Sequence, residues 1–227
     1  NPYIILNNFG VIAGDNDVVE YGESASIDLE LKNVGTEIST NTQVTINIVN
    51  NPYITLNNNQ FDVGNINPDQ TISIGDAFSF EVSHNVPNDY NFSFSLVINS
   101  DEDSWTRNIN LSAFAPILSI GELEIMNTNH TILPGEQSPV SIVIANTGGA
   151  SAHNVLVEIT DNDPFISFES NESNILLLNS GSEESVIFNL VVSESASLGY
   201  MSLLDCNLTA DNGIEGNGTL FITIGYM

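Results

Sequence analysis

The sequence predicts an all-β protein built as two tandem antiparallel β-sandwiches. Two observations carry this prediction over the 227 residues. Apolar and polar residues alternate with a period of two, and one pattern of strands and turns occurs twice. The alternating segments run for roughly five to ten residues and are separated by Gly, Pro, Asn and Asp. We find no segment with the 3.6-residue periodicity of a helix.

The internal repeat sets the expected domain boundary. Residues 22–35 align with residues 135–148, and both segments start with Gly-Glu and end with Asn-x-Gly, at Asn33–Gly35 and Asn146–Gly148. We therefore expect a tandem duplication, with residues 1–115 as the first copy and 116–227 as the second. Roughly seven or eight strands in each copy, each with one apolar face, predict a sandwich of two sheets. The order of the strands within these sheets does not follow from the sequence.

The charge balance excludes several classes of partner. Only Lys32 and Arg107 oppose 29 Asp and Glu residues, which gives a formal net charge of −27. Binding to nucleic acid or to anionic lipid needs a cluster of cations, so we expect neither. The apolar runs are far shorter than the roughly 18 residues of a membrane span, so no membrane insertion is expected. Abundant acid with scarce Lys is also typical of salt-adapted proteins.

The residues that could carry catalysis are few and scattered. Cys206 lies in an apolar alternation, which predicts a buried core residue, and a single Cys excludes an internal disulfide. His84, His130 and His153 lie in or beside turns, and none has a His counterpart in the other copy. No nucleophile with an adjacent base is apparent in this pattern. We therefore predict that this chain is not an enzyme.

Acidic loops raise the possibility of a calcium site. Asp15, Asn16 and Asp17, together with Glu20, supply the carboxylate and amide oxygens that calcium prefers. Their spacing does not match an EF-hand. These four residues are the candidate calcium ligands, no cofactor is required, and a solvated acidic loop is the alternative. Similar clusters occur at residues 101–103, 161–163 and 211–215.

Two aromatic residues, Trp105 and Tyr53, are candidates for a carbohydrate-binding platform. Tyr53 aligns with Phe165 of the second copy, and an aromatic residue that is repeated in this way indicates packing. The exposure of Trp105 distinguishes a binding platform from a packed side chain.

The turn motifs carry a resemblance to a known group of domains. Pro134-Gly135-Glu136, which is Tyr21-Gly22-Glu23 in the first copy, precedes an alternating strand that ends in Asn-x-Gly. A stretch of small residues and a further strand follow at 150–155. This pattern resembles the immunoglobulin-like repeats of very large secreted bacterial proteins, especially those beside gingipain-like cysteine peptidase domains and related surface proteases of Bacteroidetes-type bacteria. It is also similar to the broader group of cell-adhesion-related bacterial immunoglobulin-like domains.

The resemblance implies two immunoglobulin-like sandwiches, a noncatalytic role, an extracellular or cell-surface location, and calcium in the acidic loop before the Gly-Glu turn. Asp15, Asn16, Asp17 and Glu20 occupy that loop in the first copy, whereas the second copy has no carboxylate there. We therefore expect a spacer or interaction module of a larger secreted or surface protein, with a peptidase domain in its parent as the related proteins have. The expected partners are neighbouring domains of the parent chain and a protein or glycan ligand.

The alternative function is a ligand-binding adhesin or carbohydrate-binding module. The chain starts without Met and stops directly after a strand-like run, so we expect a piece of a longer polypeptide.

Overall fold

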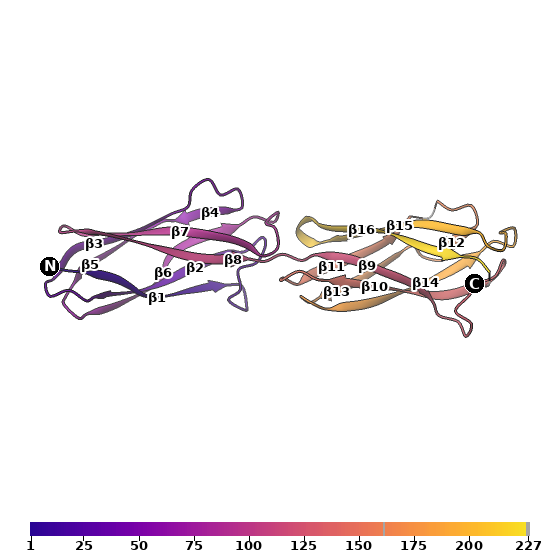
Figure 1. Cartoon of the computed structure of the whole chain (residues 1–227), viewed down its shortest axis with the longest axis horizontal. Helices are drawn as coiled ribbons and strands as arrows, with labels where there is room; N and C mark the ends of the chain where they lie inside the picture. Colours follow the sequence, from indigo (N-terminus) through magenta and orange to yellow (C-terminus); the bar gives the residue numbers. More distant parts are fainter. Residues whose placement is uncertain (161, 226–227) are drawn as a thin grey trace. The chain divides into compact units, whose positions relative to one another are not determined.

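The computed structural model describes residues 1–160 and 162–225. The chain divides into two compact units, Asn1–Ala115 (unit 1) and Pro116–Met227 (unit 2). The described residues of each unit form eight strands. The strands run as shown in Figure 1, and the all-β prediction is confirmed. The strands of unit 1 are β1 (Ile4–Ala13), β2 (Ser24–Asn33), β3 (Ser39–Asn47), β4 (Ile54–Asn58), β5 (Gln60–Ile66), β6 (Thr71–Val82), β7 (Tyr90–Asn99) and β8 (Ser104–Ala113).

Unit 2 has a matching set of strands and one short 3-10 turn, Asp211–Gly213. Its strands are β9 (Leu118–Ile125), β10 (Gln137–Asn146), β11 (Ala152–Ile159), β12 (Ile166–Phe168), β13 (Glu172–Leu178), β14 (Glu183–Val192), β15 (Met201–Ala210) and β16 (Ile214–Thr223).

Each unit consists of two four-stranded antiparallel sheets. In unit 1 the strand orders are β1-β2-β6-β4 and β5-β3-β7-β8. In unit 2 they are β9-β10-β14-β12 and β13-β11-β15-β16. Adding eight to every strand number of unit 1 gives the order of unit 2, which agrees with the internal repeat in the sequence. From β2 to β7 the chain changes sheet at every connection, so the two sheets are built from interleaved segments of the chain.

The period of two in the sequence becomes two faces of each strand. Along β2, the side chains of Ala25, Ile27, Leu29 and Leu31 are buried, and the residues between them are at least partly exposed. The same alternation in β15 places Cys206 in the core of unit 2. Burial of each large apolar side chain contributes about 1.5–3 kcal/mol relative to its exposed state.

The two sheets of each unit share one core. In unit 1 the ring of Phe80 from β6 lies 5.9 Å from that of Phe92 and 5.2 Å from that of Phe94, both of which come from β7 in the opposite sheet. In unit 2 one continuous cluster of buried side chains includes Ile142 of β10 and Val157 of β11, again from opposite sheets. Each unit therefore has the two-layer packing of a sandwich around its own core.

A buried asparagine fastens the two layers of unit 1. Asn33 ends β2 and is fully buried. Its Nδ2 donates to the main-chain oxygen of Glu37 at 2.8 Å and to that of Ile66, the last residue of β5, at 2.9 Å. Its Oδ1 accepts from the N–H groups of Gly35 at 2.9 Å and Tyr3 at 3.2 Å. One side chain thus connects β2, the turn after it, the start of β1 and the opposite sheet.

Asn146 makes the same four contacts in unit 2. Its Nδ2 donates to the main-chain oxygens of Ala150 at 2.8 Å and Leu178, the last residue of β13, at 3.1 Å. Its Oδ1 accepts from the N–H groups of Gly148 at 3.0 Å and Ile117 at 3.1 Å. An amide with two donor hydrogens and two acceptor lone pairs is fully used in this arrangement.

The glycine of the first Asn-x-Gly motif is needed for close approach. A Cβ at Gly35 would lie 2.5 Å from both the main-chain oxygen of Asn1 and the nitrogen of Tyr3. The sequence indicates this motif only as a turn. In the structure, the absence of a side chain at Gly35 also allows residues 1–3, which lead into β1, to pack directly against the turn.

Replacing either buried asparagine should destabilise its own unit. Asn33→Ala and Asn146→Ala each leave buried main-chain groups without partners, and we expect each to lower the free energy of unfolding by about 2–4 kcal/mol. In urea titrations, fluorescence of Trp105, the chain's single Trp, reports on unit 1, and alkylation of buried Cys206 reports on unit 2. The control Asn57→Ala, at an exposed position of β4, should change stability by less than about 0.5 kcal/mol. If Asn33→Ala and Asn146→Ala lowered the free energy of unfolding no more than Asn57→Ala does, the structural role given to the two buried asparagines would be wrong.

Candidate functional site

The candidate calcium loop connects β1 to β2, and main-chain hydrogen bonds define its conformation. Gly14 and Asp17 adopt positive φ angles of 48° and 58°. The Asp17 N–H donates to the main-chain oxygen of Ala13 at 2.9 Å. Farther along, Glu20 forms an isolated parallel bridge with Phe114, just after the end of β8. The loop is therefore a defined turn whose far end is attached to the last strand of its unit.

The polar atoms of this loop contact one another. The Oδ1 of Asn16 accepts from the Val18 N–H at 2.8 Å, and its Nδ2 donates to Oε1 of Glu20 at 3.1 Å. A bound cation would compete with both of these hydrogen bonds. Among residues 1–160 and 162–225, no group of three or more His, Cys, Asp or Glu side chains converges on a point that could hold a metal ion.

Glu23, which belongs to the Tyr21-Gly22-Glu23 motif but is not one of the candidate calcium ligands, lies in an electronegative environment. Burial raises the pKa of the Glu23 carboxyl above its ordinary value, and the charges of Glu20 and Asp15 act in the same direction, against a hydrogen bond from the Glu20 N–H. Calcium takes six to eight oxygens, and Asp15, Asn16, Asp17 and Glu20 do not gather into such a set. This geometry favours the solvated acidic loop, which is the alternative that the sequence offers, and the effect of calcium on stability tests the choice between the two.

The second acidic cluster, Asp101–Asp103, attaches one turn to a neighbouring strand. The single hydroxyl hydrogen of Thr40 is shared between carboxylate oxygens of Asp101 and Glu102, which lie 2.9 Å and 2.5 Å from Oγ1, and the Thr40 N–H donates to Glu102 at 3.1 Å. These hydrogen bonds from Thr40 lower the pKa of Glu102. The cluster therefore joins the β7–β8 turn to β3.

The third and fourth clusters have similar structural contacts. Asp211 accepts a hydrogen bond from the Asn154 amide at 2.8 Å. Asp161 lies outside the described residues, whereas Asn162 is exposed and Asp163 is half-buried.

Asp163 organises a small polar network. Its Oδ1 accepts from the N–H groups of Phe165 at 2.8 Å and Ile166 at 3.0 Å. Its Oδ2 accepts from the hydroxyls of Tyr200 at 2.9 Å and Ser202 at 2.6 Å. Burial acts to raise the pKa of Asp163, but these hydrogen bonds outweigh it, so the pKa lies below its ordinary value.

The repeat explains the role of this carboxylate. Asn51 occupies the equivalent place in unit 1, where its Oδ1 accepts from the N–H groups of Tyr53 and Ile54. An aromatic pair lies beside it in both units, Tyr53 with Tyr90 and Phe165 with Tyr200, each at 4.9 Å between ring centroids. The alignment of residues 51–54 with 163–166 was the signal for this turn, and the shared geometry indicates a structural function.

The remaining candidate residues occupy the positions expected of structural groups. Cys206 is buried, and burial raises the pKa of its thiol to about 11. His84, His130 and His153 are exposed, and each comes from a different segment of the chain. Trp105 is only 7% exposed and meets Tyr3 edge to face at 6.2 Å. The packing interpretation of Trp105 is confirmed, so this residue offers no free face for stacking on a sugar.

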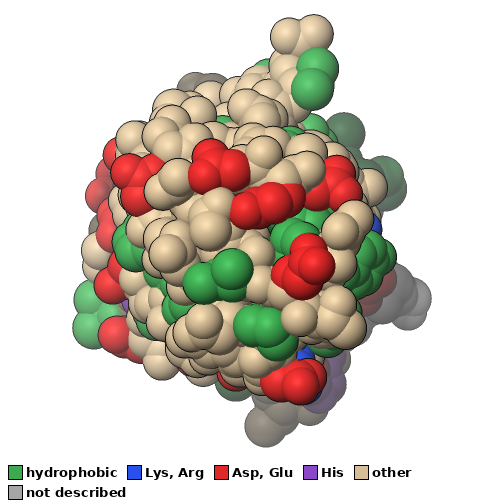
Figure 2. Space-filling model, turned by 90° about the vertical axis from the view of Figure 1, so that its left-hand side faces the viewer, with side chains coloured by type: hydrophobic (Ala, Val, Ile, Leu, Met, Phe, Trp, Pro, Cys, Tyr) green, Lys and Arg blue, Asp and Glu red, His purple; other side chains and the backbone are tan. Residues whose placement is uncertain are grey.

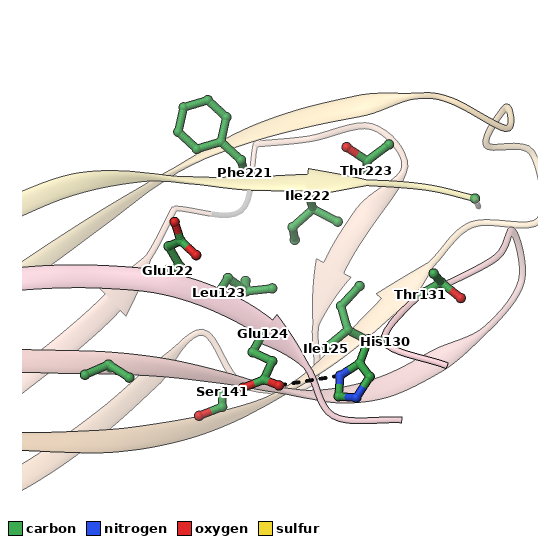
Figure 3. A pocket seen from close by; sticks show the side chains of 12 residues that line it. Glu122, Leu123, Glu124, Ile125, His130, Thr131, Ser141, Phe221, Ile222 and Thr223 are labelled. Carbon is green, nitrogen blue, oxygen red and sulfur yellow. Dashed lines mark ion pairs between the residues drawn. The ribbon is translucent and has the colours of Figure 1, made fainter. Parts of the chain in front are cut away.

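A groove that the sequence analysis did not anticipate lies in unit 2, between the edge strands β9 and β16 (Figure 3). It has a volume of about 570 Å³. Leu123 and Ile125 of β9 and Ile222 of β16 contribute its apolar lining, and Glu122 and Glu124 add carboxylates. His130 lies 3.4 Å from Glu124.

The groove exists because β9 and β16 meet at one end and separate toward the other. Where they meet, a Cβ at Gly216 would lie 3.0 Å from the Leu118 main-chain oxygen, and one at Gly218 would lie 3.4 Å from the Ile120 side chain. The register of β9 on β10 then shifts between Ile142 and Ile144. The far end is closed by the β9–β10 connection, where the Ile132 main-chain oxygen accepts from the Gly225 N–H at 2.8 Å.

Acidic side chains are distributed over the surface of the protein. On the face shown in Figure 2, Asp and Glu side chains are spread among polar and apolar groups, and no continuous area of Lys or Arg is visible. The described residues contain no helix with the length and hydropathy that a membrane crossing requires.

Comparisons with known proteins identify no family for this chain. No family model matches the sequence, and no curated protein matches it either. Among solved structures, the chain is similar to a protein of unknown function from Porphyromonas gingivalis W83. The two share 12% sequence identity over 97% of this chain and 99% of that one, with a TM-score of 0.30.

Calcium should have no specific effect on the stability of unit 1. The side chains of Asn16 and Glu20 are hydrogen-bonded to each other, and the acidic residues of the loop do not converge on a common point. We expect equal Tm values in millimolar calcium and magnesium at fixed ionic strength. A site filled at a hundred times its Kd would add about 2.7 kcal/mol of stability, which a melting curve readily detects. A calcium-specific rise in Tm that is lost in Asp15→Ala and Asp17→Ala, but kept in the control Asp205→Ala on unit 2, would contradict this expectation and establish the site.

Proposed function

We propose that the chain is a noncatalytic, immunoglobulin-like spacer and interaction module of a larger secreted or cell-surface protein. The observation that carries the proposal is the repetition of one complete unit. Both units have the same order of eight strands, their own core and an equivalent buried asparagine with four hydrogen bonds. A chain that repeats a self-sufficient unit adds length and surface without adding a reaction centre.

The strand order supports the immunoglobulin-like assignment. In such domains, strands A, B, E and D form one sheet, and C, F and G form the other. β1, β2, β6 and β4 correspond to the first set, and β3, β7 and β8 to the second. The difference is β5, which follows β4 in the chain and pairs beside β3. Unit 2 has the same additional strand, β13.

The chemistry of the chain supports a noncatalytic role. A buried thiol with a pKa of about 11 is neither accessible nor ionised near neutral pH, so Cys206 is unsuited to nucleophilic attack. The carboxylates in the predicted loops are used as hydrogen-bond acceptors for nearby turns, as at Glu102 and Asp163.

The proposed location is the cell surface or the extracellular space, and the proposed partners are neighbouring domains of the parent chain and a polypeptide ligand. The acidic, cation-poor composition supports this role because a net charge far from zero opposes self-association. The low exposure of Trp105 gives no support to the carbohydrate-binding alternative.

A spacer must keep its length under load, and single-molecule stretching of the chain from its two ends tests this. We expect two separate unfolding events, each releasing roughly 110 residues, or about 350 Å of contour length, because each unit has its own core. In Asn146→Ala only the event assigned to unit 2 should shift to lower force. A chain that extends without discrete events, or in one event, would contradict the proposed role.

A further inference from the structure

Unit 2 carries an exposed apolar patch beside the groove. Met201, Leu203 and Phe221 are 65%, 61% and 68% exposed on the outer face of β15 and β16. Leu203 and Phe221 are direct cross-strand partners, and Met201 is two residues from Leu203 on the same face. Phe221 is also among the residues that line the groove, and its ring lies on the side of β16 opposite to Ile222, so the patch borders the groove along β16 (Figure 3). Contiguous exposed apolar side chains of this kind are typical of protein interaction sites.

Unit 1 provides an internal comparison, because its fold is the same but this patch is missing. The residues equivalent to Met201 and Leu203 are Asn91 and Ser93 on β7. The cross-strand partner of Ser93 is Asn110, where unit 2 has Phe221. Since a polar surface serves the same scaffold in unit 1, packing of the fold does not require the apolar side chains of unit 2.

The backbone at the groove is also available. β9 and β16 are the end strands of their sheets, so each has one edge that pairs with no other described strand. Such an edge presents a row of N–H and C=O groups that an extended peptide can use as an added strand. From Gly121 to Ile125 the open stretch of β9 spans roughly 16 Å, enough for four or five residues of a bound strand.

Charge selects the kind of occupant. Residues 116–227 contain no Lys or Arg, and Glu122 and Glu124 line the groove. Asp205 extends the acidic character along the outer face of β15. A second copy of this chain would bring further negative charge against these carboxylates. An occupant with Lys or Arg side chains would complement them.

We propose that the groove between β9 and β16, together with Met201, Leu203 and Phe221, binds an extended cationic segment of another polypeptide as an added β-strand. Apolar side chains on the inward face of the segment contact Leu123, Ile125 and Ile222, and the aliphatic stems of its outward Lys or Arg side chains lie on Phe221. Its alternate Lys or Arg side chains lie against Glu122 and Glu124. This inference rests on the proposed interaction role and names the partner that unit 2 would hold.

The test is a titration of the full chain with a capped eight-residue peptide of alternating Val and Lys, followed by NMR and calorimetry. We expect saturable binding, with amide shifts concentrated at residues 121–125 and 219–223.

Three variants test which residues contribute to this binding. The variant Leu203→Ser/Phe221→Ser replaces two patch residues by polar ones, as at the equivalent positions of unit 1, and should weaken binding by about tenfold or more. Glu122→Gln/Glu124→Gln should weaken it and reduce its dependence on salt. Ile187→Ser, at a 55% exposed position on β14, is the matched control and should bind normally.

Two further peptides separate strand addition from general attraction to an acidic protein. Replacing each Val by Pro removes main-chain donors and prevents strand pairing, so this peptide should bind much more weakly. A Val–Glu peptide should not bind. Equal binding of the Val and Pro peptides, shifts spread over both units, or no binding at all would overturn the inference. Two intact unfolding events in the stretching experiment would leave the spacer role standing in each of those cases.

Discussion

The buried amide of Asn33, and that of Asn146 in the second unit, is the constraint on which the rest of each sandwich depends. An amide in an apolar interior must use all of its hydrogen-bonding groups, because each one left without a partner costs about 1–3 kcal/mol. Asn33 meets this requirement only when the start of β1, the turn after β2 and the end of β5 come together around it. Hydrophobic burial holds the two sheets of a unit together, and this directional set of bonds fixes how they are aligned.

Much of the fold could be predicted from the sequence because local chemistry determines it. Alternation in segments such as residues 24–33 specifies a strand with one buried face, and Gly or Asn specifies where the chain turns. The strand order could not be predicted, since it depends on long-range pairings that alternation does not encode. For the same reason the Asn-x-Gly motif indicates a turn but does not reveal the bonds from Asn33 to Ile66 or from Asn146 to Leu178.

The candidate sites were less predictable than the fold. The composition of residues 15–20 is right for calcium, but the direction of each oxygen depends on the turn, and in this turn Asn16 faces Glu20. The groove had no sequence signal, because it arises from the register shift in β9 and from the divergence of β9 and β16. The patch had a weak signal: the exposed positions of residues 201–203 break the polar pattern of residues 91–93. Comparing the two copies position by position on the outer face would have found it.

The two units show how one scaffold supports different surfaces. The inward residues of β7 are apolar, and so are those of β15 except Ser202, whereas the outward residues differ in kind, with Ser93 in one unit and Leu203 in the other. Surface residues can diverge in this way because they carry little of the packing energy, so function resides in the surface that each copy presents. In the proposed function, duplication gives length from both units and a docking surface from one.

Native-state hydrogen exchange of the amides bonded to the two asparagines tests the central claim most directly. Gly35 and Gly148 lie in turns, where amides ordinarily exchange quickly, but their N–H groups donate to Asn33 and Asn146. If these asparagines hold the sheets in place, both amides exchange only when their own unit unfolds, with the same protection as the core strands β2 and β10. Exchange at the rate of an ordinary exposed turn, with the core strands still protected, would contradict the account.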